Sequence, residues 1–476
     1  MRRLLKSVVV GLLPCLLWTD VRAQAPVEIL TVDRSTNGVR VTWSASSPGQ
    51  AYTVQVRESL ANGTWRNATT RYRWPSALTH WMDVPVNLPS TRFYRVASQA
   101  VAEPHRGKLL TGSLRDQFDL STVKAYLAEQ GVGDFVVAKY GVANRPFTYE
   151  TIDPWGLPIT ASAVMVLPRG TNGPLPLVSV QHESMVMPDA APSRTIDAPN
   201  YLWAAVFASL GYAVVMPDFL GLGSSPGYQA YLHAKSEGTC VVDALRAGIA
   251  LCASNNVSLN GQLFLTGFSQ GGHVTMAAHR EIETFHAAEF TVTAVAPSSG
   301  PYDLGGVGVE TVINDPNYPG PWVIPVLVAS YLPIYGFGET LEEVLGEPYR
   351  KTLPRLLDGS HNRGELAQAT PSDSFAILRP DFQADFRTNA ANPFRQALRE
   401  NNTYAWSPKA PVKMFHCRGD RDVDFANAEI AQASFVEQGA CCTSVVDPGA
   451  PERLDHPGCY LPSLKGTLEW FESLRR

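Results

Sequence analysis

The 476-residue sequence contains neither of two motifs that mark common bound cofactors. It has no His-Glu-x-x-His spacing for zinc and no glycine-rich loop for phosphate, so no metal and no cofactor are expected. Charge is sparse as well: charged residues make up 17% of the chain and the net charge is -5, which gives no indication of a nucleic-acid partner. With 45% hydrophobic residues, the composition is that of a globular protein, not a disordered or fibrous one.

The N-terminal apolar run is too short to span a membrane. Basic residues at positions 2, 3 and 6 precede a nearly apolar stretch over 8–18, and Val21-Arg22-Ala23 follows. A membrane span needs about 20 apolar residues, whereas this arrangement is typical of a cleaved export signal. We therefore expect a signal peptide over 1–23 and a secreted or periplasmic protein. Leu13-Pro14 before Cys15 does not favour a lipid anchor.

Cysteine is scarce but even in number after residue 23, where six of the seven remain. In an exported protein this favours one or more disulfides.

Residues 24–103 alternate apolar and polar side chains in short segments separated by turn residues, as in 38–43, 52–56, 81–84 and 92–96. This pattern predicts β-strands. A tryptophan in an early strand and a late tyrosine resemble a fibronectin-III-like sandwich. We predict a small all-β domain here.

Residues 104–476 instead alternate buried strands with helical stretches, which predicts an α/β fold with a mostly parallel sheet. Strands are expected at 176–180, 212–216, 262–266, 292–296, 412–415 and 444–446. Helices are expected at 200–210, 241–251, 272–283 and 461–474. The alternation fails over 303–400, a segment rich in Pro, Tyr and Leu that we interpret as an inserted helical cap.

Gly267-Phe268-Ser269-Gln270-Gly271 fits the nucleophile elbow of a serine hydrolase, in which a strand turns sharply into a helix. The motif alone is weak, because it arises by chance in about one chain of this length in six. Gly223-Ser-Ser225-Pro-Gly227 also fits it. That second match lies in a turn-rich loop, and Pro226 stands where the helix would begin, so Ser269 is the predicted nucleophile.

A serine nucleophile needs a histidine base and an acid that orients it, and in this fold they follow in the order Ser, Asp or Glu, His. His456 lies after the last predicted strand and is the candidate base. Asp420, at the exit of the strand 412–415, is the candidate acid, with Asp422 next. Asp424 falls later in the loop, and Asp455 is too close to His456 in sequence to orient it easily.

Backbone N–H groups must also stabilise the developing oxyanion. Gln270 is expected to provide one, and Glu183 or Ser184, just after the strand 176–180, the other. We interpret His182 as a brace for this loop, and His233, His273 and His279 as structural.

Cys417 lies three positions before Asp420, and Cys459 three positions after His456. A Cys417–Cys459 disulfide would clamp the two catalytic loops. Cys441 and Cys442 compete as partners, and spacing alone does not decide.

Several segments are typical of one group of enzymes: 181–183, 211–218 with 221–223, 267–272, 416–420, Val423 and 426–429. Through these segments the chain resembles, over residues 110–476, an α/β-hydrolase esterase, similar to the secretory lipases of the fungal lipase A type and their bacterial relatives. It departs from such relatives at Glu183, where they often have glycine, at Cys417, also a common glycine position, and at Asp424, where proline is common.

The resemblance implies hydrolysis of carboxylic esters through an acyl-enzyme, with small-molecule or polymeric substrates and an apolar or aromatic pocket under the cap. Aromatic esters, of the feruloyl or polyester type, are one alternative within this class. A secreted serine peptidase with the same triad is another, and it would use acidic cap residues for the substrate amine; Glu339, Glu342 and Glu343 are the candidates.

A third alternative is an inactive hydrolase domain carried by a binding protein. Its sandwich would then contact a surface or polysaccharide through aromatic side chains. Trp65, Trp74 and Trp81 are the candidates, although core packing explains them more simply.

Overall fold

The computed structural model describes residues 28–35, 38–44, 50–61, 65–67, 80–83, 91–100, 106–196, 201–315, 317–338 and 340–476. The predicted signal peptide at 1–23 lies outside these residues. Among the described helices, none is long and apolar enough to cross a membrane.

The regular structure among the described N-terminal residues is all β, as predicted from the alternating pattern. One antiparallel sheet has the order β1-β2-β5 and a second has the order β4-β3-β6. The side chains of Val41, Trp43, Tyr52, Val54 and Tyr94 are buried in one shared core, so the two sheets form a sandwich. The strands are β1 (Ile29–Ser35), β2 (Gly38–Trp43), β3 (Gln50–Arg57), β4 (Arg66–Asn67), β5 (His80–Asp83) and β6 (Phe93–Ala100).

The rest of the described chain is built on one large sheet with the order β16-β15-β14-β13-β11-β12-β10-β9-β7, with β8 also paired to β9. The run from β12 to β16 is parallel. The parallel strands are β11 (Leu175–Gln181), β12 (Ala213–Pro217), β13 (Leu259–Phe268), β14 (Ala294–Ser298), β15 (Val412–Phe415) and β16 (Thr443–Val446). Of these, β11, β12 and β14 are fully buried runs, which explains why the apolar segments of the sequence predicted them.

An antiparallel part that the sequence pattern did not reveal precedes this parallel sheet. β9 (Gly141–Ile152) and β10 (Pro158–Arg169) form a long hairpin, and β10 also pairs antiparallel with β12. β7 (Leu109–Gly112) and β8 (Asp116–Phe118) pair with the outer side of β9. The prediction of a mostly parallel sheet therefore holds for one half of the sheet.

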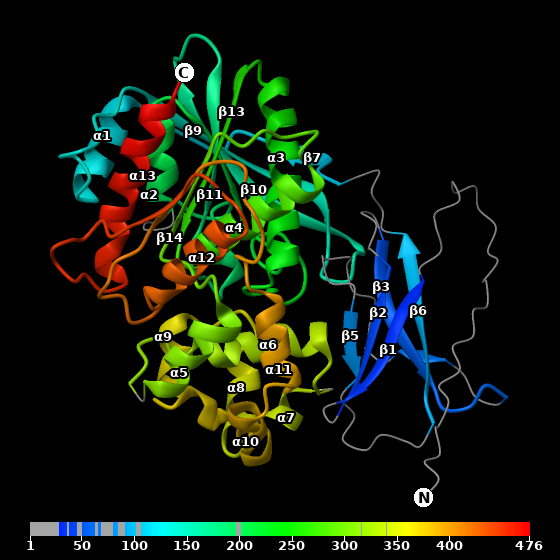
Figure 1. Ribbon diagram of the computed structural model, residues 1–476. Helices are drawn as coiled ribbons and strands as arrows, with labels where there is room; N and C mark the ends of the chain where they lie inside the picture. The colour runs from blue at the N-terminus through cyan, green and yellow to red at the C-terminus, as the bar shows by residue number, and fades with distance from the viewer. Residues whose placement is uncertain are drawn as a thin grey trace, which may run out of the picture.

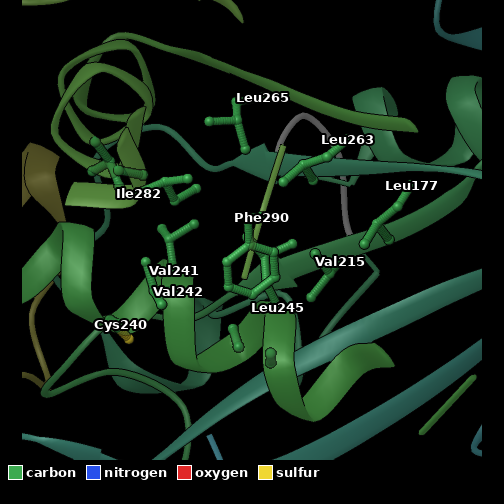
Figure 2. Packing of buried hydrophobic residues seen from close by; sticks show 14 of the residues in the cluster. Leu177, Val215, Cys240, Val241, Val242, Leu245, Leu263, Leu265, Ile282 and Phe290 are labelled. Carbon is green, nitrogen blue, oxygen red and sulfur yellow. The ribbon is translucent and has the colours of Figure 1, made fainter. Parts of the chain in front are cut away.

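Helices cover both faces of the sheet (Figure 1). α1 (Leu120–Glu129), α2 (Leu202–Ser209) and α13 (Tyr460–Leu474) bury their apolar side chains against one face. α3 (Ala234–Ser254), α4 (Gln270–Phe285) and α12 (Ala426–Glu437) cover the other. Figure 2 shows this second layer, where Leu245 and Ile282 from helices meet Val215 and Leu265 from strands. The layers confirm an α/β-hydrolase-like architecture.

The segment between β14 and β15 is helical and lies at one end of the sheet (Figure 1). It has a hydrophobic core of its own, in which Leu327, Tyr331, Phe375, Phe386 and Phe394 are buried. This agrees with an inserted helical cap. Its helices are a π-helical turn (Leu304–Gly308), α5 (Val309–Asn314), α6 (Val323–Tyr335), α7 (Leu341–Val344), α8 (Tyr349–Leu356), α9 (Arg363–Ala369), a short 3-10 helix (Ser374–Ile377), α10 (Pro380–Thr388) and α11 (Pro393–Glu400).

Candidate active site

Ser269 lies in the sharp turn between β13 and α4. Its backbone has φ 59° and ψ -120°, a conformation that L-residues rarely adopt. Strain of this kind persists only where the surrounding structure enforces it, and it is the defining feature of a nucleophile elbow. The turn holds Ser269 at the carboxyl end of the central strands, where ligands of α/β sheets bind.

The glycines around Ser269 are required by close packing. A Cβ atom at Gly271 would lie 2.1 Å from the carbonyl oxygen of Gln181, and one at Gly267 would lie 2.6 Å from the same atom. On the other side, a Cβ atom at Gly272 would lie 2.4 Å from the carbonyl oxygen of Ser298. The elbow is therefore wedged between the ends of β11 and β14, and the loop after Gln181 passes directly beside it.

His456 bridges Ser269 and Asp420. Its Nε2 lies 2.9 Å from Ser269 Oγ, and its Nδ1 lies 2.6 Å from Asp420 Oδ2. A carboxylate accepts a hydrogen, so Nδ1 carries the proton and Nε2 is free to accept the serine proton. The three residues predicted from separate parts of the sequence thus form one chain of hydrogen bonds.

Asp420 is buried, yet its charge is well supported. Its Oδ1 accepts hydrogen bonds from the backbone N–H groups of Asp422 and Val423 at 3.1 and 2.8 Å, and His416 Nε2 lies 3.5 Å from Oδ2. Burial acts to raise the pKa of Asp420, but hydrogen bonds from His416 and His456 outweigh it and hold the pKa well below its usual range. The carboxylate therefore stays ionised beside the imidazole.

The same contact acts on the histidine in the opposite sense. Burial disfavours the charged ring and acts to lower the pKa of His456, but the hydrogen bond and charge of Asp420 outweigh burial and raise it above the ordinary value. Asp422 does not contact the histidine ring among the hydrogen bonds of the described residues; its backbone N–H donates to Asp420 instead. Burial raises the pKa of the Asp422 carboxyl.

Gln270 is the first residue of α4, so its backbone N–H has no acceptor within the helix. It lies at the positive end of the helix dipole, directly after Ser269. Glu183 and Ser184 line the cleft beside Ser269 from the loop after β11. The predicted oxyanion donors therefore come from two segments, one directly after Ser269 and one lining the same cleft as Ser269.

His182 braces this loop. Its two ring nitrogens lie 2.6 Å from the carbonyl oxygen of Glu183 and 3.1 Å from that of Asp218, and its ring packs 4.2 Å from that of Phe219. Burial lowers the pKa of His182. These contacts agree with the structural role expected from the sequence.

A buried carboxylate that no motif singled out lies behind Gln270. Glu237 Oε1 accepts hydrogen bonds from Gln270 Nε2 at 2.7 Å and from the backbone N–H of Leu232 at 3.0 Å. Glu237 Oε2 lies 3.1 Å from His273 Nδ1, and His273 Nε2 lies 2.9 Å from the carbonyl oxygen of Asn401. This group ties Gln270 to the end of the cap. It has no sequence signature, because an acidic residue in the first turn of a helix is ordinary.

Ser269 opens into a cleft of about 410 Å³. Aromatic side chains form much of its wall, and Arg363 from α9 lies 3.7 Å from Glu183 across it. Arg363 also lies over the ring of Trp322. Cap residues therefore line the same cleft as Ser269. The cleft is lined by Glu183, Ser184, Phe268, Ser269, Tyr318, Trp322, Val323, Arg363, Asp422, Val423, His456, Pro457 and Tyr460.

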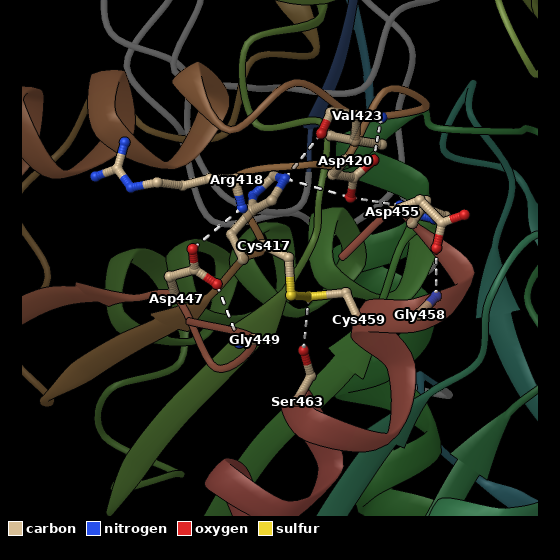
Figure 3. Close-up of a disulfide and its surroundings, with 12 residues drawn as sticks. Cys417, Arg418, Asp420, Val423, Asp447, Gly449, Asp455, Gly458, Cys459 and Ser463 are labelled. Carbon is tan, nitrogen blue, oxygen red and sulfur yellow. Dashed lines mark hydrogen bonds and ion pairs between the residues drawn. A yellow bond between two sulfur atoms is a disulfide. The ribbon is translucent and has the colours of Figure 1, made fainter. Parts of the chain in front are cut away.

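A disulfide joins Cys417 and Cys459, with their Cα atoms 5.8 Å apart. Figure 3 shows it between the loop that holds Asp420 and the start of α13, just after the loop of His456. This settles the pairing that spacing left open, and it leaves Cys441 and Cys442 on the surface.

Other residues considered in the sequence lie away from this chemistry. Ser225 is in the turn between β12 and α3. His233 caps α3 by accepting from Ser236, and His279 bonds Glu283 on its own helix. Glu342 and Glu343 are exposed on α7, and Glu339 lies outside the described residues.

On the sandwich, the guanidinium of Arg95 lies over the ring of Trp65 at 4.7 Å. The side chains of Trp74 and Trp81 lie outside what the structure describes.

The chain matches the secretory lipase family over residues 194–471. Among solved structures, it is similar to the rice cell wall degrading esterase LipA from Xanthomonas oryzae, with 30% identity over 78% of this chain and 100% of that chain, and a TM-score of 0.71. A putative hydrolase from Legionella pneumophila has 26% identity over 77% of this chain and 98% of that chain, with a TM-score of 0.70.

Candida antarctica lipase A shares the fold, with 17% identity over 76% of this chain and 83% of that chain, and a TM-score of 0.56. A comparison with curated protein sequences finds no match. The matched family region contains the elbow, the acid loop and the histidine loop. The chain therefore belongs to the secretory lipase family and is a carboxylic ester hydrolase.

Proposed function

We propose that Ser269, His456 and Asp420 are the catalytic triad of this esterase. The supporting observation is the hydrogen-bond chain of 2.9 and 2.6 Å through His456. His456 Nε2 takes the proton of Ser269 Oγ as the oxygen attacks the ester carbonyl, and then gives that proton to the departing alcohol. Water attacks the resulting acyl-enzyme by the same route, which releases the acid and restores Ser269. Asp420 holds the ring and balances its charge throughout.

The oxyanion of each tetrahedral intermediate is stabilised by backbone donors. In our proposal Gln270 N–H is the first donor, and Glu183 or Ser184 N–H is the second. Two observations support it. Gln270 is the first residue of α4, so its N–H has no acceptor within the helix, and the 183–184 segment lines the cleft next to Ser269. Donors fixed in advance stabilise the charge without reorganisation.

We propose an apolar or aromatic acyl group as the part of the ester that enters the cleft. Phe268, Tyr318, Trp322 and Tyr460 line it, and such side chains give large apolar contacts. This lining also favours aromatic esters as a second candidate. LipA is described as degrading the rice cell wall, so esters of a wall polymer deserve inclusion among the substrates. A peptidase is less well supported, because the described acidic candidates of the cap are exposed on α7.

A panel of esters tests these proposals. We expect the wild type to hydrolyse p-nitrophenyl and feruloyl esters and to leave aminoacyl anilides intact. The rates from acetate to long acyl esters measure which acyl length the cleft accepts. Ser269→Ala should lose activity to the background level, and Ser225→Ala should retain it. Equal activity of Ser269→Ala and wild type would remove the catalytic assignment, and faster anilide hydrolysis would favour a peptidase.

We propose the organisation predicted from the sequence: a signal peptide over 1–23, a fibronectin-III-like domain over 24–103, a catalytic domain over 104–476 and its cap over 303–400, in a secreted or periplasmic protein. The extent of the structural match, 78% of this chain against the whole of LipA, supports a separate catalytic domain. Contact of the N-terminal domain with a surface or polysaccharide is part of this proposal, and no nucleic-acid partner is expected.

A further inference from the structure

Cys441 and Cys442 are adjacent and exposed in the connection between α12 and β16. Their sulfur atoms lie 2.8 Å apart. Non-bonded heavy atoms settle at roughly 3.5–4 Å, and a disulfide bond measures about 2.05 Å. The two sulfurs therefore already face each other, inside the usual packing distance and less than about 1 Å from bonding distance.

This orientation matters because neighbouring cysteines rarely meet by chance. Adjacent Cα atoms are about 3.8 Å apart across a trans peptide, slightly below the usual Cα separation of disulfides, about 4.4–6.8 Å. A disulfide between neighbouring cysteines closes a small ring of backbone and side-chain atoms. This ring forms only where the local backbone turns both side chains to the same side. The connection supplies that turn: α12 ends at Glu437, Gly439 follows with a φ of 86°, and the strand begins at Thr443.

No other described cysteine competes for these two thiols. Cys417 and Cys459 are bonded to each other. Cys240 and Cys252 are buried on α3, and Cys240 packs among the side chains of the helix layer in Figure 2. Each of the exposed cysteines therefore has the other as its nearest described thiol.

We propose that Cys441 and Cys442 are an oxidation site and form a vicinal disulfide in the secreted enzyme. The oxidant is a disulfide-bearing thiol oxidoreductase or a small-molecule disulfide. One cysteine thiolate attacks the oxidant disulfide and displaces a thiol, and the neighbouring thiolate then attacks the mixed disulfide and displaces the second. The two cysteines lose one hydrogen each, and their two electrons reduce the oxidant disulfide to two thiols.

The bond would fix the start of the last strand. The carbonyl oxygen of Cys442 accepts a hydrogen bond from Val412 N–H at 2.9 Å, which is where the chain joins β15. β15 leads to Asp420, and β16 leads to the segment that carries His456. The ring therefore rigidifies the turn that aligns these two strands at the edge of the sheet.

Peptide mass mapping of the full, exported protein tests this proposal. The protein is purified without reductant, denatured in N-ethylmaleimide and cut with trypsin. Cleavage after Arg421 and Arg453 gives a peptide over 422–453 that contains Cys441 and Cys442 and no other cysteine. We expect this peptide to be unlabelled and lighter than the dithiol by two hydrogen atoms. After reduction it should take up two maleimides.

Peptides 414–418 and 454–465, joined by Cys417 and Cys459, are the internal control for preserved disulfides. In Cys442→Ser, the remaining exposed thiol of Cys441 should become reactive to maleimide in the native protein. Two maleimides on peptide 422–453 without reduction, or a link between two copies of it, would overturn the proposal.

Discussion

Asp420 raises the pKa of His456 above the ordinary value of about 6.5. In the proposed mechanism His456 accepts a proton only while its ring is neutral, so activity should fall as the pH drops through this raised pKa. We expect the acidic limb of kcat/KM to have its midpoint above about 6.5. Asp420→Asn should lower kcat by about 10³- to 10⁴-fold and move the midpoint to lower pH.

A pH profile of wild type and Asp420→Asn with one soluble ester measures both effects. Asp422→Asn is the matched control, because its side chain does not orient the ring. An unshifted midpoint in Asp420→Asn would mean that Asp420 does not set the charge of His456, whatever the loss in rate.

Glu237 should act as a positioning residue through its 2.7 Å bond to the side chain of Gln270. Glu237→Ala frees that side chain, and a small displacement of a catalytic group costs up to about 10²-fold in rate. We expect kcat to fall with little change in KM, because the oxyanion exists only after substrate has bound. Glu237→Gln, which retains an acceptor, should restore most of the rate.

Steady-state kinetics and the affinity for an oxyanion-mimicking boronic acid report this effect. Glu281→Gln is the matched control, since it breaks the buried 2.7 Å pair with Lys235 on the same face of the sheet and should lower Tm without changing kcat. If Glu237→Ala and Glu281→Gln lose the same stability and neither loses rate, Glu237 is only structural.

The site was predictable where its parts have local signatures. The strand before Ser269, the helix after it and the order of Asp420 and His456 along the chain are readable from the sequence. Glu237 and Arg363 were not, because their roles arise from contacts across 33 and 180 positions that no spacing encodes. The second oxyanion donor also depends on how one loop packs, and is not specified by residue type.

The disulfide acts on two elements at once. Cys417 follows β15 and Cys459 precedes α13, so their bond closes a loop that contains both Asp420 and His456. Replacing both with serine should lower the free energy of unfolding by about 2–5 kcal/mol. It should also lower kcat, because the acid and base loops lose their common anchor.

Urea denaturation and ester kinetics on Cys417→Ser/Cys459→Ser check this. Cys441→Ser/Cys442→Ser is the control, because it removes a cysteine pair whose bond would close only a two-residue loop, and it should keep most of the stability and full activity. An unchanged urea midpoint in the first variant would show that packing alone holds the two loops.

Elements differed in how clearly the sequence predicted them. Strands of the parallel half, such as β11 and β12, are uninterrupted buried runs and stand out. β9 mixes buried residues with Arg145, Thr148 and Glu150, because it is paired antiparallel and partly faces solvent. These polar residues interrupt the apolar pattern, so the sequence did not predict the long strand β9 or its hairpin with β10.

The whole molecule contains more than the solved LipA chain does, since that chain is covered completely by 78% of this one. A chain beginning at residue 104 should therefore fold and hydrolyse small soluble esters at the wild-type rate. If the N-terminal sandwich contacts a surface, this shorter chain should be slower only on insoluble polymeric esters.

Parallel assays of both chains on a soluble ester and on polymer particles, together with a polysaccharide pull-down, make this comparison. Equal rates on particles would assign the sandwich no part in substrate contact. Loss of the soluble activity would show instead that the catalytic domain needs the sandwich for stability.

The cap is filled by its own side chains, with Tyr231 and Leu232 as the contribution from the segment before α3. Its interior is thus separate from the layers that hold the elbow and the triad loops. In evolutionary terms, this separation makes the enzyme modular. Mutations in the cap can change which esters enter the cleft while the residues beneath it stay the same. Related enzymes can therefore differ in substrate and share one mechanism.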